Sequence, residues 1–480
     1  MNSSEHLGLV VGFDLDMTLI DTTAGFAATL EALAEELGLE LPVAELSARL
    51  GPPLELILEP HVDADRIDAV TDRFREIYPD HAIAGTPALP GVATALAAVR
   101  RHGGRVVLVT GKHTPNARLH VDHLGLDVDV VEGRVWGVGK GEVLRREGAT
   151  VYVGDHVHDV EGARAAGAVS VSVLTGGCTR AELESAGTDV VLEDLSGFPD
   201  WLDAHVLASR LAGLEAALRE LGRVLVAFSG GADSAFLLAA AVRALGAENV
   251  AAATAHSESL PASERQPARD LAESLGVQVL TPRTSEMERD GYRANAGDRC
   301  AFCKAELLET LAPLAEEHGY SAVATGTNAD DVRAGFRPGI AAARERGAVT
   351  PLLDAGLTKE QVRSASRAWG LPTWDKPAAA CLSSRVAYGI EITPARLARV
   401  EQAESSLRTS LLAAGHPVRD LRVRDLGDRA VVEVDPGLVG VVAAHLDGVR
   451  RAGFAAVEVD PRGFRSGAMN ELLAEPERYR

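Results

Sequence analysis

The stretch Val224-Leu225-Val226-Ala227-Phe228-Ser229-Gly230-Gly231-Ala232-Asp233-Ser234 joins an apolar run to an Ala/Leu-rich helical pattern through a glycine turn. Such a run, turn and pattern predict a buried parallel strand followed directly by a helix. Two glycines let the backbone approach an anion closely, and the N–H groups at the helix start can hold a phosphate. No Gly-Lys-Ser/Thr follows, so this is not the Walker pattern. A glycine turn alone is equally typical of a plain strand–helix connection.

The same alternation of apolar runs and helical patterns predicts α/β units with parallel sheets along most of the chain. Further strands are predicted at residues 9–13, 106–109, 151–153, 169–174, 250–254, 277–280 and 322–325. Residues 22–84 carry helical patterns alone, which predicts a helical insertion after the first strand. The periodicity breaks at residues 195–201 before a helix at 207–221, and strands at 431–434 and 456–459 predict a small α+β tail. We therefore expect three parts, at residues 1–198, 205–375 and 376–480.

The composition favours a cytoplasmic α/β protein with several domains. At 480 residues the chain is about three times the usual domain size. The apolar fraction of 46% suffices for full cores, and the net charge of -21 argues against a nucleic-acid partner. Four cysteines cannot form a disulfide scaffold, the first residues do not form a signal peptide, and no stretch approaches the ~18 apolar residues of a membrane span. We expect no membrane partner and a homo-oligomer.

Paired carboxylates follow the predicted first strand. Asp14 and Asp16 lie where ligands bind in open α/β sheets, so one can attack a phosphoryl group while the other protonates the leaving oxygen. A pair of solvated loop acids is the alternative interpretation. Later strands lead to a hydroxyl, a lysine and two more carboxylates that complete a phosphate and Mg²⁺ site: Thr110, Lys140, Asp155 and Asp159.

This set resembles the haloacid dehalogenase (HAD) superfamily, phosphoglycolate-phosphatase-like branch, over residues 1 to about 195. The resemblance implies a Rossmann-like hydrolase domain that acts on a phosphate ester, with the insertion at about 22–84 as its cap. It implies Asp14 as nucleophile, Asp16 as general acid/base, Thr110 and Lys140 as phosphate binders, and a Mg²⁺ site at Asp14, Asp16, Asp155 and Asp159. Met17 stands where glycine is commoner. His156 and His158 are expected to be bystanders.

The spelling Ser-Gly-Gly-x-Asp-Ser resembles the PP-loop ATP pyrophosphatases, whose α/β domain is of the adenine-nucleotide-hydrolase type. Three downstream stretches narrow the resemblance to the LarE family, over about residues 205 to 460. They are Asp298-Arg299-Cys300-Ala301-Phe302-Cys303-Lys304, residues 324–331 with 336–339, and the run Trp374-Asp375-Lys376-Pro377-Ala378-Ala379-Ala380-Cys381-Leu382-Ser383-Ser384-Arg385.

LarE proteins are ATP-dependent sulfur transferases that act on pyridinium-3,5-biscarboxylic acid mononucleotide, a precursor of a nickel-binding cofactor. The resemblance implies that ATP adenylates a carboxylate and that a sulfur nucleophile then displaces AMP. It implies ATP binding by Ser229, Gly230, Gly231, Asp233 and Ser234. A tRNA-thiolating PP-loop enzyme is the alternative, and it would need a basic surface that a charge of -21 does not suggest.

The cysteines leave the sulfur source open. In some family members the cysteine at the place of Cys381 gives up its own sulfur, whereas others hold a [4Fe-4S] cluster on three cysteines. Cys300 and Cys303 form a C-x-x-C pair that, with Cys381, would leave one iron of a cubane open. Zinc, a redox dithiol or inert thiols are other interpretations of the pair. Cys178 belongs to the hydrolase-like unit and is expected to be a bystander.

Basic residues near the tail are candidates for substrate binding. Arg422 and Arg424 alternate with apolar residues and would emerge on one face of a strand, where they could hold the nucleotide phosphate. Surface arginines paired with Asp425 or Asp428 are the alternative. Ser383 and Arg385 lie inside the family motif, and the resemblance alone places Glu404 at an assembly interface or a metal.

Overall fold

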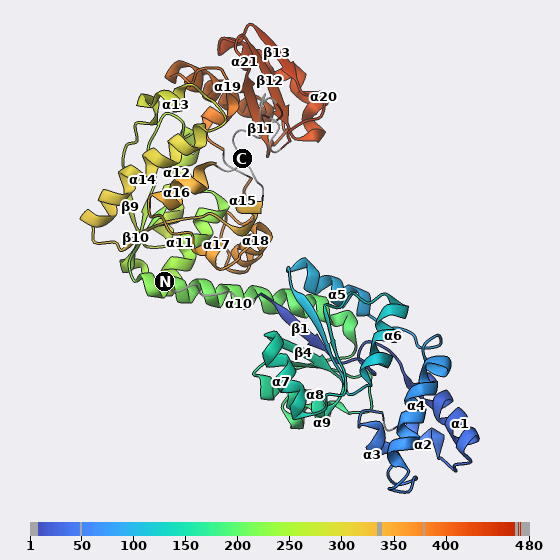
Figure 1. The fold of residues 1–480 in the computed structure, drawn as a ribbon. Helices are drawn as coiled ribbons and strands as arrows, with labels where there is room; N and C mark the ends of the chain where they lie inside the picture. The colour runs from blue at the N-terminus through green and yellow to red at the C-terminus, as the bar shows by residue number, and fades with distance from the viewer. Residues whose placement is uncertain are drawn as a thin grey trace. The chain divides into compact units, whose positions relative to one another are not determined.

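The computed structural model describes residues 8–48, 50–333, 338–377, 380–465, 469 and 471. The chain divides into two compact units, Met1–Val206 and Leu207–Arg480, and the boundary falls within helix α10 (Phe198–Leu221). Figure 1 shows the two units and their element labels. Each unit is described by itself below. None of the described helices combines the length and the apolar character that a membrane span needs.

A six-stranded parallel sheet forms the centre of the first unit, in the order β3-β2-β1-β4-β5-β6. Its strands are β1 (Val10–Phe13), β2 (Arg105–Val109), β3 (Val130–Glu132), β4 (Val151–Gly154), β5 (Val169–Val173) and β6 (Val190–Leu192). The helices around it are α5 (Val92–Arg101), α6 (Thr114–Leu124), α7 (Val138–Glu147), α8 (Val157–Ala166) and α9 (Arg180–Ala186). Successive residues of β1 belong to two separate cores: Val11 and Phe13 pack on one face of the sheet, and Val10 packs on the other. The strand is therefore apolar throughout, as the central strand of a covered parallel sheet must be.

Four helices are inserted after β1 and have a core of their own. They are α1 (Thr23–Leu37), α2 (Val43–Ser47), α3 (Leu54–Leu58) and α4 (Ile67–Ala82), gathered at one end of the first unit in Figure 1. Phe26 of α1 packs against Phe74 of α4, with ring centroids 5.3 Å apart. This independent packing lets the insertion form a separate wall over the carboxyl ends of the strands.

The second unit contains two sheets. The larger is parallel, in the order β10-β7-β8-β9, and is built from β7 (Val224–Ala227), β8 (Val250–Ala253), β9 (Gln278–Leu280) and β10 (Ala322–Thr325). Helices around it include α11 (Ala232–Leu245), α12 (Ala262–Ser274), α14 (Arg299–Glu317), α16 (Pro338–Glu345) and α18 (Lys359–Ala368). The smaller sheet, in the order β11-β12-β13, comprises β11 (Leu421–Asp425), β12 (Arg429–Val434) and β13 (Ala456–Val459). It shares a core with α19 (Pro394–Ala413).

These elements confirm the predicted fold class of two α/β units in series and a small α+β tail. Two edge strands were missed, because β3 and β6 have only three residues each and are only partly buried. The prediction of irregular chain before a helix at residue 207 was wrong, since α10 already begins at Phe198. Proline is tolerated in the first helical turn, so Pro199 does not prevent this start. Phe198 and Leu202 are buried in the first core and hold the helix there.

Candidate active sites

Three carboxylates converge at the carboxyl ends of β1 and β4. Asp14, Asp155 and Asp159 each offer an oxygen within 4.8 Å of the others, and all three are buried. Lys140 on α7 donates to Asp14 Oδ1 at 2.7 Å and to Asp159 Oδ1 at 2.6 Å. The Thr18 hydroxyl donates to Asp155 Oδ1 at 2.8 Å. This compact charged centre is thus built from a turn, a strand end, a helix start and one lysine.

The electrostatics of this centre fit a hard divalent cation. Burial raises the pKa of Asp14 to about 7, although Lys140 opposes the shift. Burial, together with the nearby Asp159 and Asp14, also raises the pKa of Asp155 well above its ordinary value. One lysine does not balance three buried carboxylates held this close, and Mg²⁺ prefers oxygen ligands of this kind. The three aspartates therefore suit Mg²⁺.

Asp16 stands apart from the three converging aspartates and faces a different lysine. Lys112 Nζ donates to Asp16 Oδ1 at 2.6 Å, and this neighbour lowers the pKa of Asp16 although burial acts in the opposite direction. Asp16 was predicted as a member of the metal set, and Lys112 was not predicted as its partner. A lysine two residues after Thr110, at the end of β2, was the pattern that could have indicated it.

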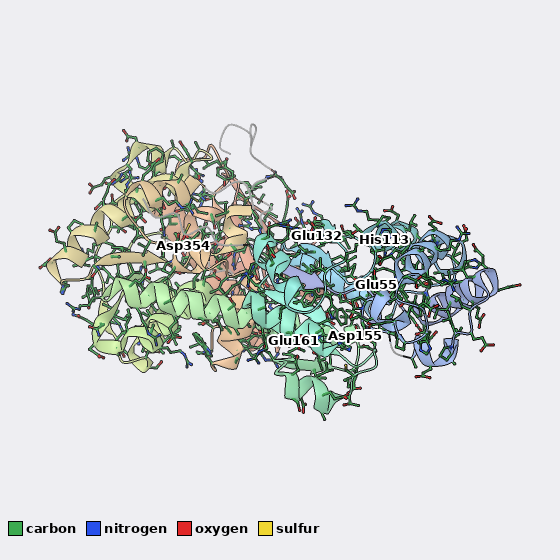
Figure 2. The ribbon with its side chains drawn as sticks, turned by 60° about the horizontal axis from the view of Figure 1, so that its bottom comes forward. Glu55, His113, Glu132, Asp155, Glu161 and Asp354 are labelled. Atoms are coloured by element: carbon green, nitrogen blue, oxygen red, sulfur yellow. The ribbon has the colours of Figure 1, made fainter. Side chains whose placement is uncertain are left out.

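A cavity joins this centre to the helical insertion. Thr110 lines it beside Asp14 and Lys140, and its hydroxyl accepts from the Lys112 backbone N–H at 3.2 Å. Glu55 of the insertion and His113 of the sheet unit line the same cavity as Asp155, and Figure 2 labels these three residues. The site is therefore enclosed by both parts of the first unit, with room for a phosphate ester between them.

The glycine turn of the second unit lies between β7 and α11, at the start of a long helix. Gly230 has φ of 71°, and a Cβ there would lie 2.7 Å from that of Ala268, so only glycine fits. Ser229, Gly231, Asp233 and Ser234 line a second cavity. The helix start and these small residues border a concave surface, a geometry that suits an anion such as phosphate.

Three lysines surround this turn. Lys304 of the C-x-x-C-Lys stretch lines the cavity, Lys359 pairs with Asp233 Oδ2, and Lys376 Nζ donates to the Gly230 carbonyl at 2.9 Å. The other carboxylate oxygen of Asp233 is buried and has no hydrogen-bond partner. Sequence reasoning did not assign roles to these lysines, because Lys359 and Lys376 follow the turn by more than a hundred residues.

The three cysteines of the second unit lie near one another. Burial raises the pKa of the Cys303 thiol, and neighbouring Cys381 and Cys300 raise it further. Among the residues that the structure describes, however, their sulfurs do not form a group within 4.8 Å, whereas the aspartates do. Ligands of one zinc ion must converge on a single atom, while cluster ligands bind different irons. The three sulfurs of the described residues therefore do not form a preorganised site for one ion. Cys178 lies in the first unit.

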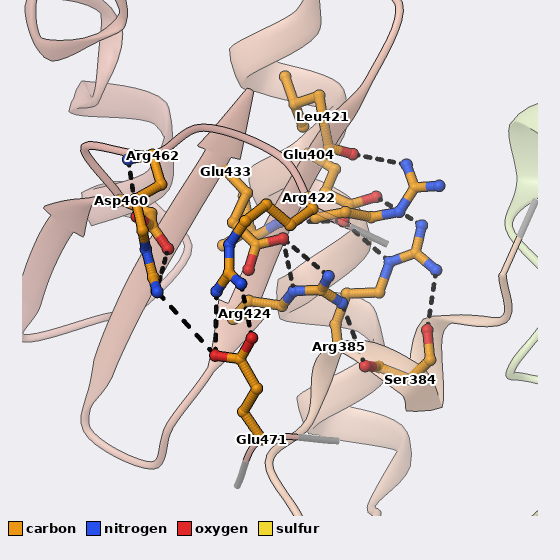
Figure 3. A network of polar contacts seen from close by, with 12 residues as sticks. Ser384, Arg385, Glu404, Leu421, Arg422, Arg424, Glu433, Asp460, Arg462 and Glu471 are labelled. Atoms are coloured by element: carbon orange, nitrogen blue, oxygen red, sulfur yellow. Dashed lines mark hydrogen bonds and ion pairs between the residues drawn. The ribbon is translucent and has the colours of Figure 1, made fainter. Parts of the chain in front are cut away.

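Buried arginines hold the segment that follows Cys381. Figure 3 shows Arg385 and Arg424 with their acidic partners. Arg385 Nε and Nη2 donate to Glu404 at 3.0 and 3.3 Å, and Arg424 donates to Glu433 Oε2 from Nε at 3.0 Å and from Nη2 at 2.7 Å. Burial, with Arg385 and Arg424 nearby, lowers the pKa of Arg422 to about 10.

The arginine network corrects one expectation. The partner of Arg424 is Glu433 on the facing strand, not Asp425, which pairs with Arg396 and Arg399. Glu404 pairs with Arg385 inside the unit. Ser383 is fully buried, and its hydroxyl lies 2.6 Å from that of Tyr292. Residues 336 and 337 of the motif run, with Ala378 and Ala379, lie outside the described residues.

Known proteins resemble both units. Residues 11–164 match the haloacid dehalogenase-like hydrolase family, residues 142–198 a HAD-hydrolase-like family, and residues 208–296 the NAD synthase family. An uncharacterized protein of Synechocystis sp. is 40% identical over 276 residues, which are 56% of this chain and 100% of the relative. The pyridinium-3,5-bisthiocarboxylic acid mononucleotide synthase of Lactiplantibacillus plantarum is 36% identical over 275 residues, 56% of this chain and 97% of that protein. The chain belongs to the LarE family.

This LarE-family chain also carries a HAD hydrolase domain, and it is an enzyme. A phosphoglycolate phosphatase of Caulobacter vibrioides is 28% identical over 218 residues, 40% of this chain and 90% of that protein. The family resemblance found in the sequence is thereby confirmed for both units. Around Cys381 the structure adds Tyr292, Asn295 and Arg299, which the sequence analysis left without roles.

Proposed function

We propose that the second unit is an ATP-dependent sulfurtransferase that converts carboxylates of pyridinium-3,5-biscarboxylic acid mononucleotide to thiocarboxylates. Membership of the LarE family supports the substrate class. The observation that carries the proposal is that Cys300, Cys303 and Cys381 gather in the same unit as the glycine turn, with Lys304 of the cysteine stretch lining the turn's cavity. Helix α14 therefore connects the two groups, since it carries Cys300 and Cys303 and also Lys304, which lines the cavity at the turn.

The reaction needs two steps at this site. A substrate carboxylate oxygen attacks the α-phosphorus of ATP, pyrophosphate leaves, and an acyl adenylate forms. A sulfur nucleophile then attacks the acyl carbon and displaces AMP, which is a much better leaving group than oxide. The backbone N–H groups around Gly231 and the start of α11 stabilise the phosphates, with Ser229, Asp233 and Ser234 beside them. Arg422 and Arg424, near Arg385, supply cations for the mononucleotide phosphate.

A [4Fe-4S] cluster on Cys300, Cys303 and Cys381 is our preferred sulfur source. The mutual proximity of the thiols and their spread beyond single-ion spacing fit this group. When bound through three cysteines, such a cluster has one iron open for an additional sulfide. Sacrifice of the Cys381 sulfur, leaving dehydroalanine, is the second candidate, favoured by the position of Cys381 directly before the motif residues Ser383 and Arg385.

For the first unit we infer a Mg²⁺-dependent phosphohydrolase. Asp14 attacks the phosphorus, Asp16 first protonates the leaving alcohol and then takes a proton from the attacking water, and Lys140 and Thr110 hold the phosphate. Mg²⁺, held by Asp14, Asp155 and Asp159, would neutralise charge on the phosphoryl oxygens. We assign residues 1–198 to this domain with its cap at about 22–84, 205–375 to the PP-loop domain, and 376–480 to substrate binding and sulfur transfer.

We infer a cytoplasmic homo-oligomer whose partners are small molecules. A net charge of -21 disfavours the tRNA-thiolating alternative, because RNA binding needs compensating positive surface.

Anaerobic purification with iron and sulfide analysis tests the sulfur source. We expect about four irons per chain, with loss of iron in Cys300→Ser, Cys303→Ser and Cys381→Ser and retention in the matched control Cys178→Ser. Iron-free protein that forms product while Cys381 loses the mass of H₂S would contradict the cluster and support sacrifice. Absence of substrate-dependent exchange between pyrophosphate and ATP would contradict adenylation itself.

A further inference from the structure

An aromatic wall borders the cavity of the first unit. Trp136, between β3 and α7, lines this cavity together with Asp14 and Thr110. Its indole lies against the turn after β2, since a Cβ on Gly111 would be 3.4 Å from a ring atom of Trp136. A glycine at position 111 leaves space for the ring directly beside the hydroxyl that we assign to phosphate binding. The wall and the phosphate site are therefore adjacent.

Two histidine rings extend this wall towards the helical insertion. The ring centroids of His156 and His158 lie 5.7 and 4.6 Å from that of Trp136, and 4.9 Å from each other. His156 packs against the insertion, because a Cβ on Gly51 would be 3.1 Å from its ring. The three rings therefore form a cluster that packs against both parts of the unit, and its position is fixed from two sides.

The remaining lining combines apolar side chains of the insertion with charged groups, and its cationic side chains already face carboxylates. Phe74 and other apolar side chains of the insertion face the cavity. Among the described residues of the lining, each lysine or arginine faces a protein carboxylate: Lys140 faces Asp14 and Asp159, Lys112 faces Asp16, and Arg75 faces Glu55 and Asp72. A short substrate with a second anionic group would have to compete with these carboxylates. An uncharged ring would instead bury apolar surface against the wall.

We propose that the first unit hydrolyses phosphomonoesters whose alcohol carries an aromatic ring, with nucleoside 5′-monophosphates as the substrate class. The ring stacks on Trp136 while the phosphate lies at Asp14, Thr110 and Lys140. Water and the ester give the nucleoside and inorganic phosphate, so no other reactant is needed. The proposal rests on the hydrolase function inferred above and adds what selects the substrate.

Phosphate release by the full chain with Mg²⁺ tests the proposal. Uridine 5′-monophosphate and ribose 5-phosphate share the same primary alcohol, and only the former carries a ring. We expect kcat/KM for uridine 5′-monophosphate to exceed that for ribose 5-phosphate and phosphoglycolate at least tenfold. Asp14→Asn should abolish all release, which assigns the activity to this unit. Equal or better hydrolysis of ribose 5-phosphate or phosphoglycolate would overturn ring selection and leave the hydrolase function intact.

Variants of the wall separate stacking from folding. Trp136→Ala should raise KM for uridine 5′-monophosphate at least tenfold while changing KM for ribose 5-phosphate less than twofold. Val138 is exposed, and the control variant Val138→Ala should change neither KM. If Trp136→Ala does not fold, the proposal is tested by the ratio of kcat/KM for the two substrates in the wild type and by the KM values of Trp136→Leu. An equal loss for both substrates in a folded Trp136 variant would also overturn the proposal. Failure of the wild type to hydrolyse any of the esters would instead contradict the hydrolase function.

Discussion

The guanidinium of Arg299 and the carbonyl of Ser383 are joined by a 2.8 Å hydrogen bond across 84 positions of sequence. The same Nη1 donates to Asn295 Oδ1 at 2.6 Å, and Asn295 in turn donates to the Ala387 carbonyl at 2.8 Å. Arg299 is 4% exposed. One buried side chain at the start of α14 thus fixes the segment after Cys381 to the helix that carries Cys300.

Replacement of Arg299 by methionine should release this segment. The change leaves Asn295 Oδ1 without its donor and leaves the Ser383 carbonyl with the Val386 N–H alone, and a buried unsatisfied acceptor costs about 1–3 kcal/mol. We expect the free energy of unfolding of the second unit to fall by about 2 kcal/mol or more. Product formation should fall at least tenfold with little change in KM for ATP. Urea denaturation and a steady-state assay measure the two effects.

The matched control is Arg450→Met, since Arg450 is an exposed partner of Asp447 on α21 (Asp447–Arg451). Such surface pairs contribute only about 0–1 kcal/mol, so the free energy of unfolding and the rate of product formation should both remain near the wild-type values. Arg299→Lys keeps the charge but lacks the planar fork, and should lie between the two. If Arg299→Met behaves like Arg450→Met, the anchoring role is wrong.

Mg²⁺ affinity of the first unit should increase with pH. Burial raises the pKa of Asp14 to about 7, so below that pH the carboxyl holds a proton that the ion must displace. Above it the Asp14 carboxylate is free and contributes no further dependence, while burial raises the pKa of Asp155 as well, so protonation of that ligand adds to the loss of affinity at low pH. We expect the ionisation of Asp14 to lower the dissociation constant for Mg²⁺ about fivefold between pH 6 and pH 7 and only about twofold between pH 7 and pH 8. Titration calorimetry at several pH values measures it.

Asp14→Asn removes the titrating group and provides the comparison. This variant should bind Mg²⁺ more weakly and with a shallower pH dependence. A dissociation constant that stays constant from pH 6 to pH 8 in the wild type would contradict the raised pKa of Asp14.

The first unit shows what local patterns can predict. Asp14, Thr110 and Asp155 each follow a strand directly, and parallel strands bring their carboxyl ends to one edge, so Asp14 and Asp155 had to be neighbours. The position of Asp16 beside Lys112 was not predictable, because a two-residue spacing does not determine how the turn after β1 directs each side chain. Trp136 was missed for a similar reason, since β3 is too short to give a pattern.

The second unit shows which contacts local sequence patterns cannot predict. The glycine turn was evident because strand, turn and helix are contiguous. The partners of the turn and of Cys381 come from distant segments, such as Lys359 with Asp233 and Tyr292 with Ser383. Their pairing depends on how α13 (Asp290–Arg293), α14 and α18 pack, which no local periodicity encodes.

The buried pair Arg385–Glu404 should be sensitive to loss of one partner. Their side chains are 4% and 14% exposed, so Arg385→Met would leave Glu404 as a buried charge without its partner. Breaking a buried pair in this way costs about 3–5 kcal/mol. The double change Arg385→Met with Glu404→Met should recover part of that loss, because the Val423 N–H and the Cys381 carbonyl still lose their side-chain partners. Arg429→Met, at the exposed pair with Glu458, is the control. Equal stability of Arg385→Met and Arg429→Met in urea would contradict the structural role of the pair.

Two glycines in the second unit should respond oppositely to alanine. At Gly230 the backbone has φ of 71°, and an added Cβ would lie 2.7 Å from that of Ala268, so Gly230→Ala strains the turn and moves it against α12. We expect a loss of about 1–3 kcal/mol in the free energy of unfolding and at least tenfold weaker ATP binding. Gly213 lies inside α10 with nothing within 4 Å of its added Cβ. Gly213→Ala should therefore stabilise the chain by about 0.5–1 kcal/mol and leave ATP binding unchanged. Urea denaturation and nucleotide titration of both variants measure this contrast, and unchanged ATP binding in Gly230→Ala would contradict the assignment of the turn to phosphate binding.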